Sequence, residues 1–136
     1  MHITGSAISL TVDDVRASAK FLADHFGFSE RMAADGFASL SHNSPHHAQS
    51  LDIIFLRTGI EVLPDDLRER RAAGVIVAFV VDDLEAEEAR LRAAGVPITV
   101  PIREEPWGER LFMVTDPNGV IYELVSWVQP AVIPPR

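Results

Sequence analysis

Glu123 is the residue of this chain that is best suited to chemistry. It stands within residues 120–127, VIYELVSW, an otherwise mostly apolar run with the composition of a β-strand. Side chains alternate between the two faces of a strand. One face therefore carries Ile121, Glu123, Val125 and Trp127, and the other carries Val120, Tyr122 and Leu124. A carboxylate on an apolar face has a raised pKa, which suits proton abstraction. In its charged, partly desolvated form the same carboxylate could instead pair with a cationic group.

Arg110 offers a structural alternative for Glu123. It falls on the strand that is expected to face residues 120–127, so the two side chains can form an internal ion pair. In that case replacing Glu123 with leucine would leave a buried charge unpaired and cost several kcal/mol. Trp107, the centre of a PWG triplet, adds a flat aromatic surface just before that strand. Stacking or cation–π contact on such a ring contributes about 0.5 to 2 kcal/mol, although covering a sheet edge is the alternative role.

Metal chemistry has few candidate ligands in this sequence. The chain has no cysteine and five histidines. His42, His46 and His47 fall in a stretch that Pro45 interrupts, which is typical of a solvated loop. His25 comes late in a predicted helix, where a cationic imidazole suits the helix dipole. Transition metals normally bind through imidazole or thiolate, so the sequence predicts no metal and no other cofactor.

Two copies of one unit must position these residues. VDDV at residues 12–15 and VDDL at residues 81–84 each follow a strand-like run and precede a helix-like run that ends at Gly27 or Gly95. Aspartates suit helix N-caps, and Asp82 with Glu85 has the spacing of a capping box. A left-handed glycine is expected to close each helix.

Three strand-like runs follow each predicted helix. In the first copy they lie near residues 29–33, 36–42 and 50–56, and in the second near 97–101, 110–115 and 120–128. The turn Asp116-Pro117-Asn118-Gly119 should form a tight hairpin, with left-handed angles at Asn118 and Gly119. The sequence therefore predicts an α+β fold built from two βαβββ modules.

Neither copy can bury its sheet face alone, so residues 1–136 are expected to form one pseudo-symmetric domain. Module one covers about residues 1–58 and module two about 74–128. The connector, about 59–73, carries Pro64 and a run of charges, and is expected to include a short solvated helix. The tail, residues 129–136, is proline-rich and is expected to be extended.

Composition narrows the partners of the protein. The formal net charge is −8, which argues against nucleic acid and favours neutral or cationic ligands, although solubility alone also explains it. No apolar run is long enough to span a membrane, and the N-terminal residues do not resemble a secretion signal. Without cysteine there is no disulfide framework, so the expected location is the cytoplasm.

With its two modules, its two VDD helix entries and the segment PWGERLFMVTDPNGVIYEL at residues 106–124, the chain resembles the vicinal oxygen chelate superfamily. This superfamily includes glyoxalase I, extradiol dioxygenases and bleomycin-resistance proteins. The resemblance implies that the modules form a curved, mostly antiparallel sheet with an inner groove and with the helices outside. It also implies a homodimer.

The resemblance gives Glu123 a specific meaning, because the metal-dependent relatives have a metal ligand at this position. The histidines of those relatives would fall at Ala7 and Ile76, which cannot bind a metal. The remaining ligand would fall on the strand at residues 50–56, where Asp52 is the candidate. This leaves two carboxylates and no imidazole. The chain therefore resembles most closely the metal-free bleomycin-resistance branch, which has the tryptophan of its PWG triplet beside a drug groove.

The resemblance to that branch implies a protein of antibiotic-resistance type that sequesters a hydrophobic or aromatic, in some cases cationic, small molecule without catalysis. The candidate ligand-binding residues are Trp107, Glu123, Ser9, Thr11, Asp52 and Arg110. No catalytic residue is assigned. The alternative is a lyase, isomerase or dioxygenase-like enzyme that uses Glu123 as a base, or as a ligand of a weakly held metal together with Asp52. A third reading is an accessory domain with no ligand of its own.

Overall fold

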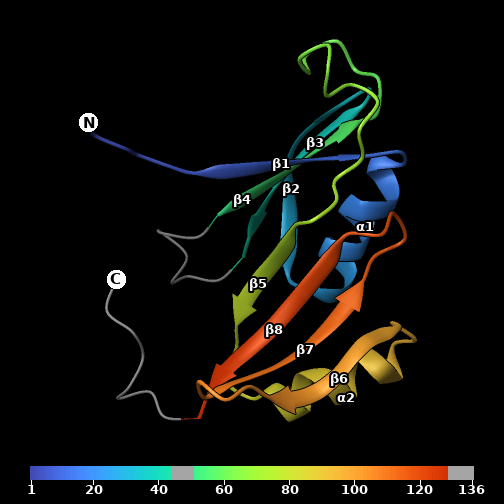
Figure 1. Cartoon of the computed structure of the whole chain (residues 1–136). Coiled ribbons are helices and arrows are strands. Elements are labelled where there is room, and N and C mark those ends of the chain that lie inside the picture. Colours follow the sequence, from blue (N-terminus) through green and yellow to red (C-terminus); the bar gives the residue numbers. More distant parts are fainter. Residues whose placement is uncertain (44–50, 129–136) are drawn as a thin grey trace. The chain divides into compact units, whose positions relative to one another are not determined.

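The computed structural model describes residues 1–43 and 51–128. The elements, in chain order, are β1 (Ala7–Val12), α1 (Val15–His25), β2 (Phe28–Ala34), β3 (Phe37–His42), β4 (Asp52–Arg57), β5 (Ile76–Val80), α2 (Leu84–Ala93), β6 (Ile98–Glu104), β7 (Glu109–Thr115) and β8 (Ile121–Trp127) (Figure 1). The chain divides into two compact units, Met1–Ala73 and Gly74–Arg136. His46, His47 and the tail at residues 129–136 lie outside the described residues.

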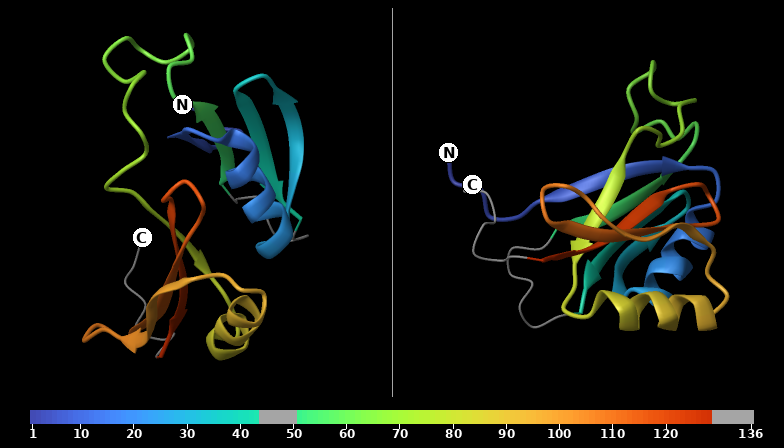
Figure 2. Two further views of the ribbon diagram at one scale, coloured as in Figure 1. Left: turned by 90° about the vertical axis from the view of Figure 1, so that its right-hand side faces the viewer. Right: turned by 60° about the horizontal axis from the view of Figure 1, so that its bottom comes forward.

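Each unit contains one βαβββ module with its own four-stranded sheet. The strand orders are β1-β4-β3-β2 and β5-β8-β7-β6. In each sheet the first and last strands of the module pair in parallel, and the other pairs are antiparallel. Each helix packs on the sheet of its own module (Figure 2). The α+β class and the two βαβββ modules predicted from the sequence are confirmed.

Aspartate side chains begin both helices. The Asp14 carboxylate accepts the backbone N–H of Ala17 at 3.1 Å, and that of Asp83 accepts the N–H of Ala86 at 3.0 Å. The capping box predicted at Asp82 is therefore wrong: the cap is Asp83, and Ala86, three residues on, has no side chain that could complete a capping box. Each helix has two adjacent aspartates at its entry, and in both copies it is the second that caps the helix.

Glycines with positive φ close the helices and the final hairpin. The φ angles of Gly27 and Gly95 are 72° and 81°, as predicted for left-handed residues after a helix. Gly119 has φ 87° in the β7–β8 turn. Of the two residues expected to tolerate a left-handed angle, Gly119 adopts it and Asn118 does not, because no described residue other than glycine has a positive φ.

The core of each module lies between its helix and one face of its sheet. The most deeply buried side chains are Val12, Leu22, Leu40, Ile53 and Phe55 in the first module, and Leu84, Leu91, Phe112, Val114 and Tyr122 in the second. Val120, Tyr122 and Leu124 are at most 4% exposed, so the face that was expected to pack on helices is confirmed. Neither of the two described helices has the length and apolar composition that crossing a bilayer requires.

The connector forms turns, and the short helix predicted there is wrong. The Arg68 guanidinium donates hydrogen bonds to the carbonyl oxygens of Leu63 at 2.9 Å and Glu61 at 3.0 Å. In a helix these carbonyls would instead accept backbone N–H groups. The Arg68 carbonyl accepts the N–H of Gly59 at 2.6 Å. Single turns result, because Pro64 in addition has no N–H to donate.

The end of the connector is attached to module one. The N–H of Ala72 donates to the carbonyl of Thr11 in β1 at 2.7 Å. Arg71 donates through Nε to Asp13 at 2.6 Å, and Thr58 donates to the other oxygen of the same carboxylate at 2.7 Å. Both hydrogen bonds lower the pKa of Asp13, with the contribution of Arg71 the larger.

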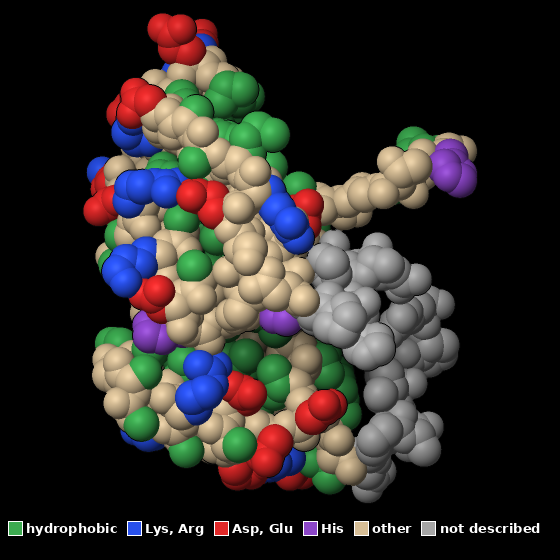
Figure 3. Space-filling model, turned by 180° about the vertical axis from the view of Figure 1, so that it is seen from behind, with side chains coloured by type: hydrophobic (Ala, Val, Ile, Leu, Met, Phe, Trp, Pro, Cys, Tyr) green, Lys and Arg blue, Asp and Glu red, His purple; other side chains and the backbone are tan. Residues whose placement is uncertain are grey.

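Charged side chains on the surface are mostly paired. On the face seen in Figure 3, acidic and basic side chains lie next to one another without forming a single basic patch. The ion pairs of the described residues include Arg16–Glu30 at 2.5 Å and Arg57–Asp35 at 2.8 Å. Exposed pairs of this kind contribute little to stability individually.

Candidate functional site

Glu123 lies in the middle of β8, on the sheet face opposite the buried Tyr122 and Leu124. Its partners across the sheet are Ala78 on β5 and Met113 on β7. The side chain is half-buried, and no described residue forms a hydrogen bond or ion pair with its carboxylate. The inward carboxylate expected from the sequence thus stands without a neutralising partner in the described part of the chain.

The pKa of Glu123 is raised from its ordinary value. Burial on the sheet is the main cause, and the negative charge of Glu109 adds to it. Arg103 lowers the pKa, and Glu105 raises it by a smaller amount. The carboxylate therefore holds its proton more tightly than a solvated glutamate does.

Apolar side chains surround Glu123 on its face of the sheet. Leu111 and Val125, which pair with each other in the next row, are 2% and 3% exposed. Ile76 and Val80 on β5 are 50% and 73% exposed. The carboxylate thus stands on a largely apolar surface, part of which is open.

Trp107 is in the turn between β6 and β7, as expected from the sequence. The turn is closed by backbone bonds from Gly108 N–H to the Glu105 carbonyl at 3.0 Å and from Glu105 N–H to the Glu109 carbonyl at 2.7 Å. Gly108 has φ 91°, a conformation that a side chain would strain. The Trp107 side chain is 62% exposed, and its Nε1–H donates to Glu109 Oε1 at 3.0 Å.

The sequence analysis missed Glu109. By strand alternation, Glu109 faces the same side of the sheet as Glu123. Arg103 and Glu105 form an ion pair at 2.8 Å. Strand alternation alone could have placed Glu109 on the face of Glu123. Its contact with Trp107 depends on a side-chain conformation that no sequence pattern reveals.

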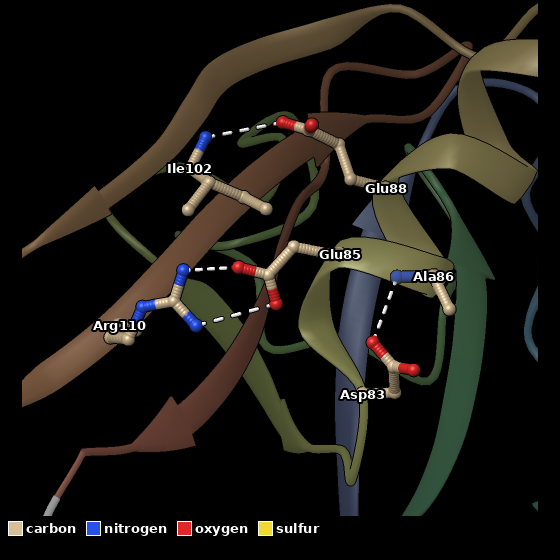
Figure 4. A network of polar contacts seen from close by, with 6 residues as sticks. All are labelled: Asp83, Glu85, Ala86, Glu88, Ile102 and Arg110. Carbon is tan, nitrogen blue, oxygen red and sulfur yellow. Dashed lines mark hydrogen bonds and ion pairs between the residues drawn. The ribbon is translucent and has the colours of Figure 1, made fainter.

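Arg110 does not face Glu123, so the internal pair considered from the sequence is wrong. Its partner across the sheet is Ser126, which places Arg110 on the helix side, whereas Glu123 pairs with Met113. The guanidinium binds both carboxylate oxygens of Glu85 on α2, with Nη1 to Oε1 at 3.3 Å (Figure 4). Arg110 thus anchors the start of α2 to its sheet and lies away from the proposed ligand face.

The other three predicted site residues are in the first unit. Ser9 and Thr11 lie on the less buried face of β1. Asp52 on β4 pairs with Ala7 and lies on the same face of the sheet. Ser41 Oγ donates to Asp52 Oδ1 at 2.9 Å. The structure thus places these residues on one face of the first sheet, while Trp107 and Glu123 belong to the second.

The strand register corrects the position assigned to Asp52. Ser9 pairs with Ile54 in the first sheet as Ala78 pairs with Glu123 in the second. The counterpart of Glu123 is therefore Ile54, and Asp52 corresponds to Ile121. At the positions that the resemblance gives to metal ligands, the first unit holds Ala7 and Ile54, and the second holds Ile76 and Glu123. One of these four side chains is a carboxylate, and three are apolar.

These residues do not fit a metal ion. Within residues 1–43 and 51–128, no group of three or more histidine, cysteine, aspartate or glutamate side chains could hold one. A transition metal also prefers imidazole or thiolate ligands. No step of a metal-dependent reaction follows from this arrangement.

Residues 2–124 match the glyoxalase/bleomycin resistance protein/dioxygenase superfamily, and the chain belongs to this family. No curated protein matches it. Among solved structures, a glyoxalase/bleomycin resistance protein/dioxygenase from Nocardioides is similar, with 19% identity, a TM-score of 0.73, and coverage of 96% of this chain and 87% of the other.

Two further solved structures show the same fold. TioX from Micromonospora sp. ML1 is 23% identical with a TM-score of 0.67, over 92% of this chain and 99% of its own. A lactoylglutathione lyase from Agrobacterium tumefaciens is 18% identical with a TM-score of 0.68, over 88% of this chain and 90% of its own. At these identities the likeness establishes the fold and leaves the activity open.

The unpartnered carboxylate leads to a prediction for stability. Replacing Glu123 with glutamine should stabilise the protein at neutral pH, by up to about 1 kcal/mol for a half-buried group. Because the folded-state pKa is raised, the stabilising contribution of the protonated carboxyl is present below the ordinary pKa of glutamate. It is lost as pH rises through the raised pKa. Urea unfolding of both proteins should therefore show a difference at neutral pH that vanishes in acid.

The exposed Glu104 provides the matched control. Glu104→Gln removes the same charge from the same region and should change the free energy of unfolding little. Glu123→Leu should also unfold at or above the wild-type midpoint, since Arg110 keeps Glu85 as its partner. A Glu123→Gln protein that is less stable than wild type at neutral pH would show that the carboxylate has a favourable partner.

Proposed function

We propose that this protein binds a flat hydrophobic or aromatic molecule, preferentially a cation, and sequesters it without catalysis. The observation that carries the proposal is a half-buried carboxylate, Glu123, with no hydrogen-bonding or ion-pairing partner in the described residues and with apolar neighbours. The exposed ring of Trp107 in the same unit supports it.

The charges near Glu123 favour a cationic ligand. Glu109 and Glu105 add negative charge, and Arg103, the cation that lowers the pKa of Glu123, is paired with Glu105. Stacking and cation–π contact on Trp107 each supply about 0.5 to 2 kcal/mol, and a positive charge beside Glu123 adds an ion pair. Binding should weaken as pH falls through the raised pKa of Glu123, because the protonated carboxyl no longer attracts a cation.

Two acridines of similar shape test the proposal. 9-Aminoacridine is a cation at neutral pH, and acridine-9-carboxylate is an anion. Calorimetric titration of wild type should show binding of the cation at least about tenfold tighter than that of the anion. Glu123→Gln should remove most of this preference, whereas the control Glu104→Gln should retain it. Equal affinity for the two probes, or binding of neither, would overturn the proposal.

An enzyme with Glu123 as general base is the second candidate. The raised pKa of this carboxyl favours it, since a carboxylate with a raised pKa is a stronger base than a solvated one. In the other form of this candidate, Glu123 is a ligand of a weakly held metal. We expect less than about 0.1 zinc, iron, manganese or nickel per chain by elemental analysis. About one metal per chain that is lost in Glu123→Gln would favour the enzyme.

The partners inferred from the resemblance remain part of this proposal. A homodimer is expected, because members of the family commonly pair, and light scattering on the purified protein tests it. The cytoplasmic location and the absence of nucleic-acid and membrane partners are expectations of the same kind. Resistance to an antibiotic is the cellular role that sequestration would serve.

A further inference from the structure

Within residues 1–43 and 51–128, the Trp107 side chain forms one hydrogen bond, and its partner is Glu109. The indole Nε1–H donates to Oε1 of Glu109 at 3.0 Å. The edge of the ring that carries the N–H is therefore held, while 62% of the side chain remains exposed. A ring that is held at one edge and is exposed over much of its surface can stack with a flat molecule.

The backbone on both sides of this contact is fixed. Glu109 is the first residue of β7 and pairs with Trp127 across the sheet. Its carbonyl accepts the N–H of Glu105, and the carbonyl of Gly108 accepts the N–H of Val128 at 2.9 Å. The freedom that remains to Trp107 is rotation of its side chain, and the bond to Glu109 is what restricts it.

We propose that Glu109 is the positioning residue of the ligand site: its carboxylate holds the Trp107 ring by the N–H edge so that a ring face stays open for a flat cation. This inference rests on the proposed function. Glu109 also faces the same side of the sheet as Glu123 and adds its negative charge there. One side chain thus serves both halves of the site, by orienting the aromatic surface and by strengthening the attraction for a cation.

Two substitutions separate these roles. Glu109→Gln keeps an oxygen acceptor for the indole N–H and removes the charge, whereas Glu109→Met removes both at similar length. Glu104→Met is the control. Glu104 is exposed, and it pairs across the sheet with Arg110, which lies on the helix side and away from Glu123. The two tryptophans of the chain are distinguished by assigning their indole N–H signals with Trp127→Phe.

The first readout needs no ligand. In ¹⁵N-labelled protein, Glu109→Met should speed hydrogen exchange of the Trp107 indole N–H by about fivefold or more, and Glu109→Gln should stay near the wild-type rate. Glu104→Met should leave it unchanged. An indole exchange rate in Glu109→Met equal to that of wild type would overturn the positioning role.

The second readout is the affinity for 9-aminoacridine. We expect Glu109→Met to bind about tenfold more weakly and Glu109→Gln about threefold more weakly, with melting temperatures unchanged. Faster indole exchange with wild-type affinity would overturn the inference and leave the proposed function standing. If wild type itself does not bind the probe, the proposed function fails, and the exchange rates still decide whether Glu109 holds the ring.

Discussion

Replacing Trp107 with alanine should weaken binding of 9-aminoacridine by about 2 kcal/mol or more, which is roughly thirtyfold in affinity. The ring is the large exposed aromatic surface of the second unit, and its removal takes away the stacking platform. The free energy of unfolding should change by less than about 0.5 kcal/mol, because the side chain is 62% exposed. Calorimetric titration and urea unfolding of the same preparations measure the two quantities.

Trp127→Phe is the control for Trp107→Ala, since Trp127 is a half-buried strand residue and the change retains an aromatic ring. It should bind the probe with an affinity within about twofold of wild type. The opposite result for Trp107→Ala, a large loss of stability with unchanged affinity, would make Trp107 a structural cover of the sheet. It would then also remove the support that Trp107 gives to sequestration over catalysis.

Replacing Asp116 with alanine should destabilise the protein by about 2 to 3 kcal/mol. Asp116 is 5% exposed, and its Oδ1 accepts the N–H of Asn118 at 2.8 Å and that of Val120 at 2.9 Å. Without the carboxylate, both donors lose their partner inside the β7–β8 turn. Unfolding in urea, followed by circular dichroism, measures the loss.

Asp116→Asn is the matched variant, because the amide oxygen can still accept both N–H groups. It should lose less than about 1 kcal/mol. If Asp116→Ala unfolds at the wild-type urea concentration, the turn is held by its backbone bonds alone, from Gly119 N–H to the Asp116 carbonyl at 3.0 Å and from Asp116 N–H to the Val120 carbonyl at 2.9 Å.

The fold could be predicted because local signals repeat and agree. The two VDD entries, the glycines after the helices and the alternating strands each specify an element, and all of these elements are present. The connector could not be predicted, because its turns depend on Arg68 reaching back to carbonyls several residues away. A charged, polar segment gives the same composition whether such a side chain folds inward or remains in solvent.

The site was predicted less well, and strand register is the reason. A one-residue change in register moves a side chain to the other face of a sheet. The turn at residues 116–120 pairs Thr115 with Ile121, and this alone sets Met113 opposite Glu123 and directs Arg110 to the helix side. The sequence analysis chose Asp52 as the counterpart of Glu123, which is two residues from the true counterpart, Ile54. The register of β4 could not be predicted from the sequence of the residues that precede it.

The parallel pairing of the first and last strands of each module sets the order of assembly. In the described residues β1 has β4 as its strand partner, and β5 has β8. The β2–β3 and β6–β7 hairpins can form early, because few residues separate their strands. The first strand of each module, β1 or β5, has no strand partner until the last strand, β4 or β8, has been synthesised and has paired with the hairpin. Slow, long-range loop closure should therefore limit the folding rate of each module, and loss of β4 or β8 should prevent the corresponding module from folding.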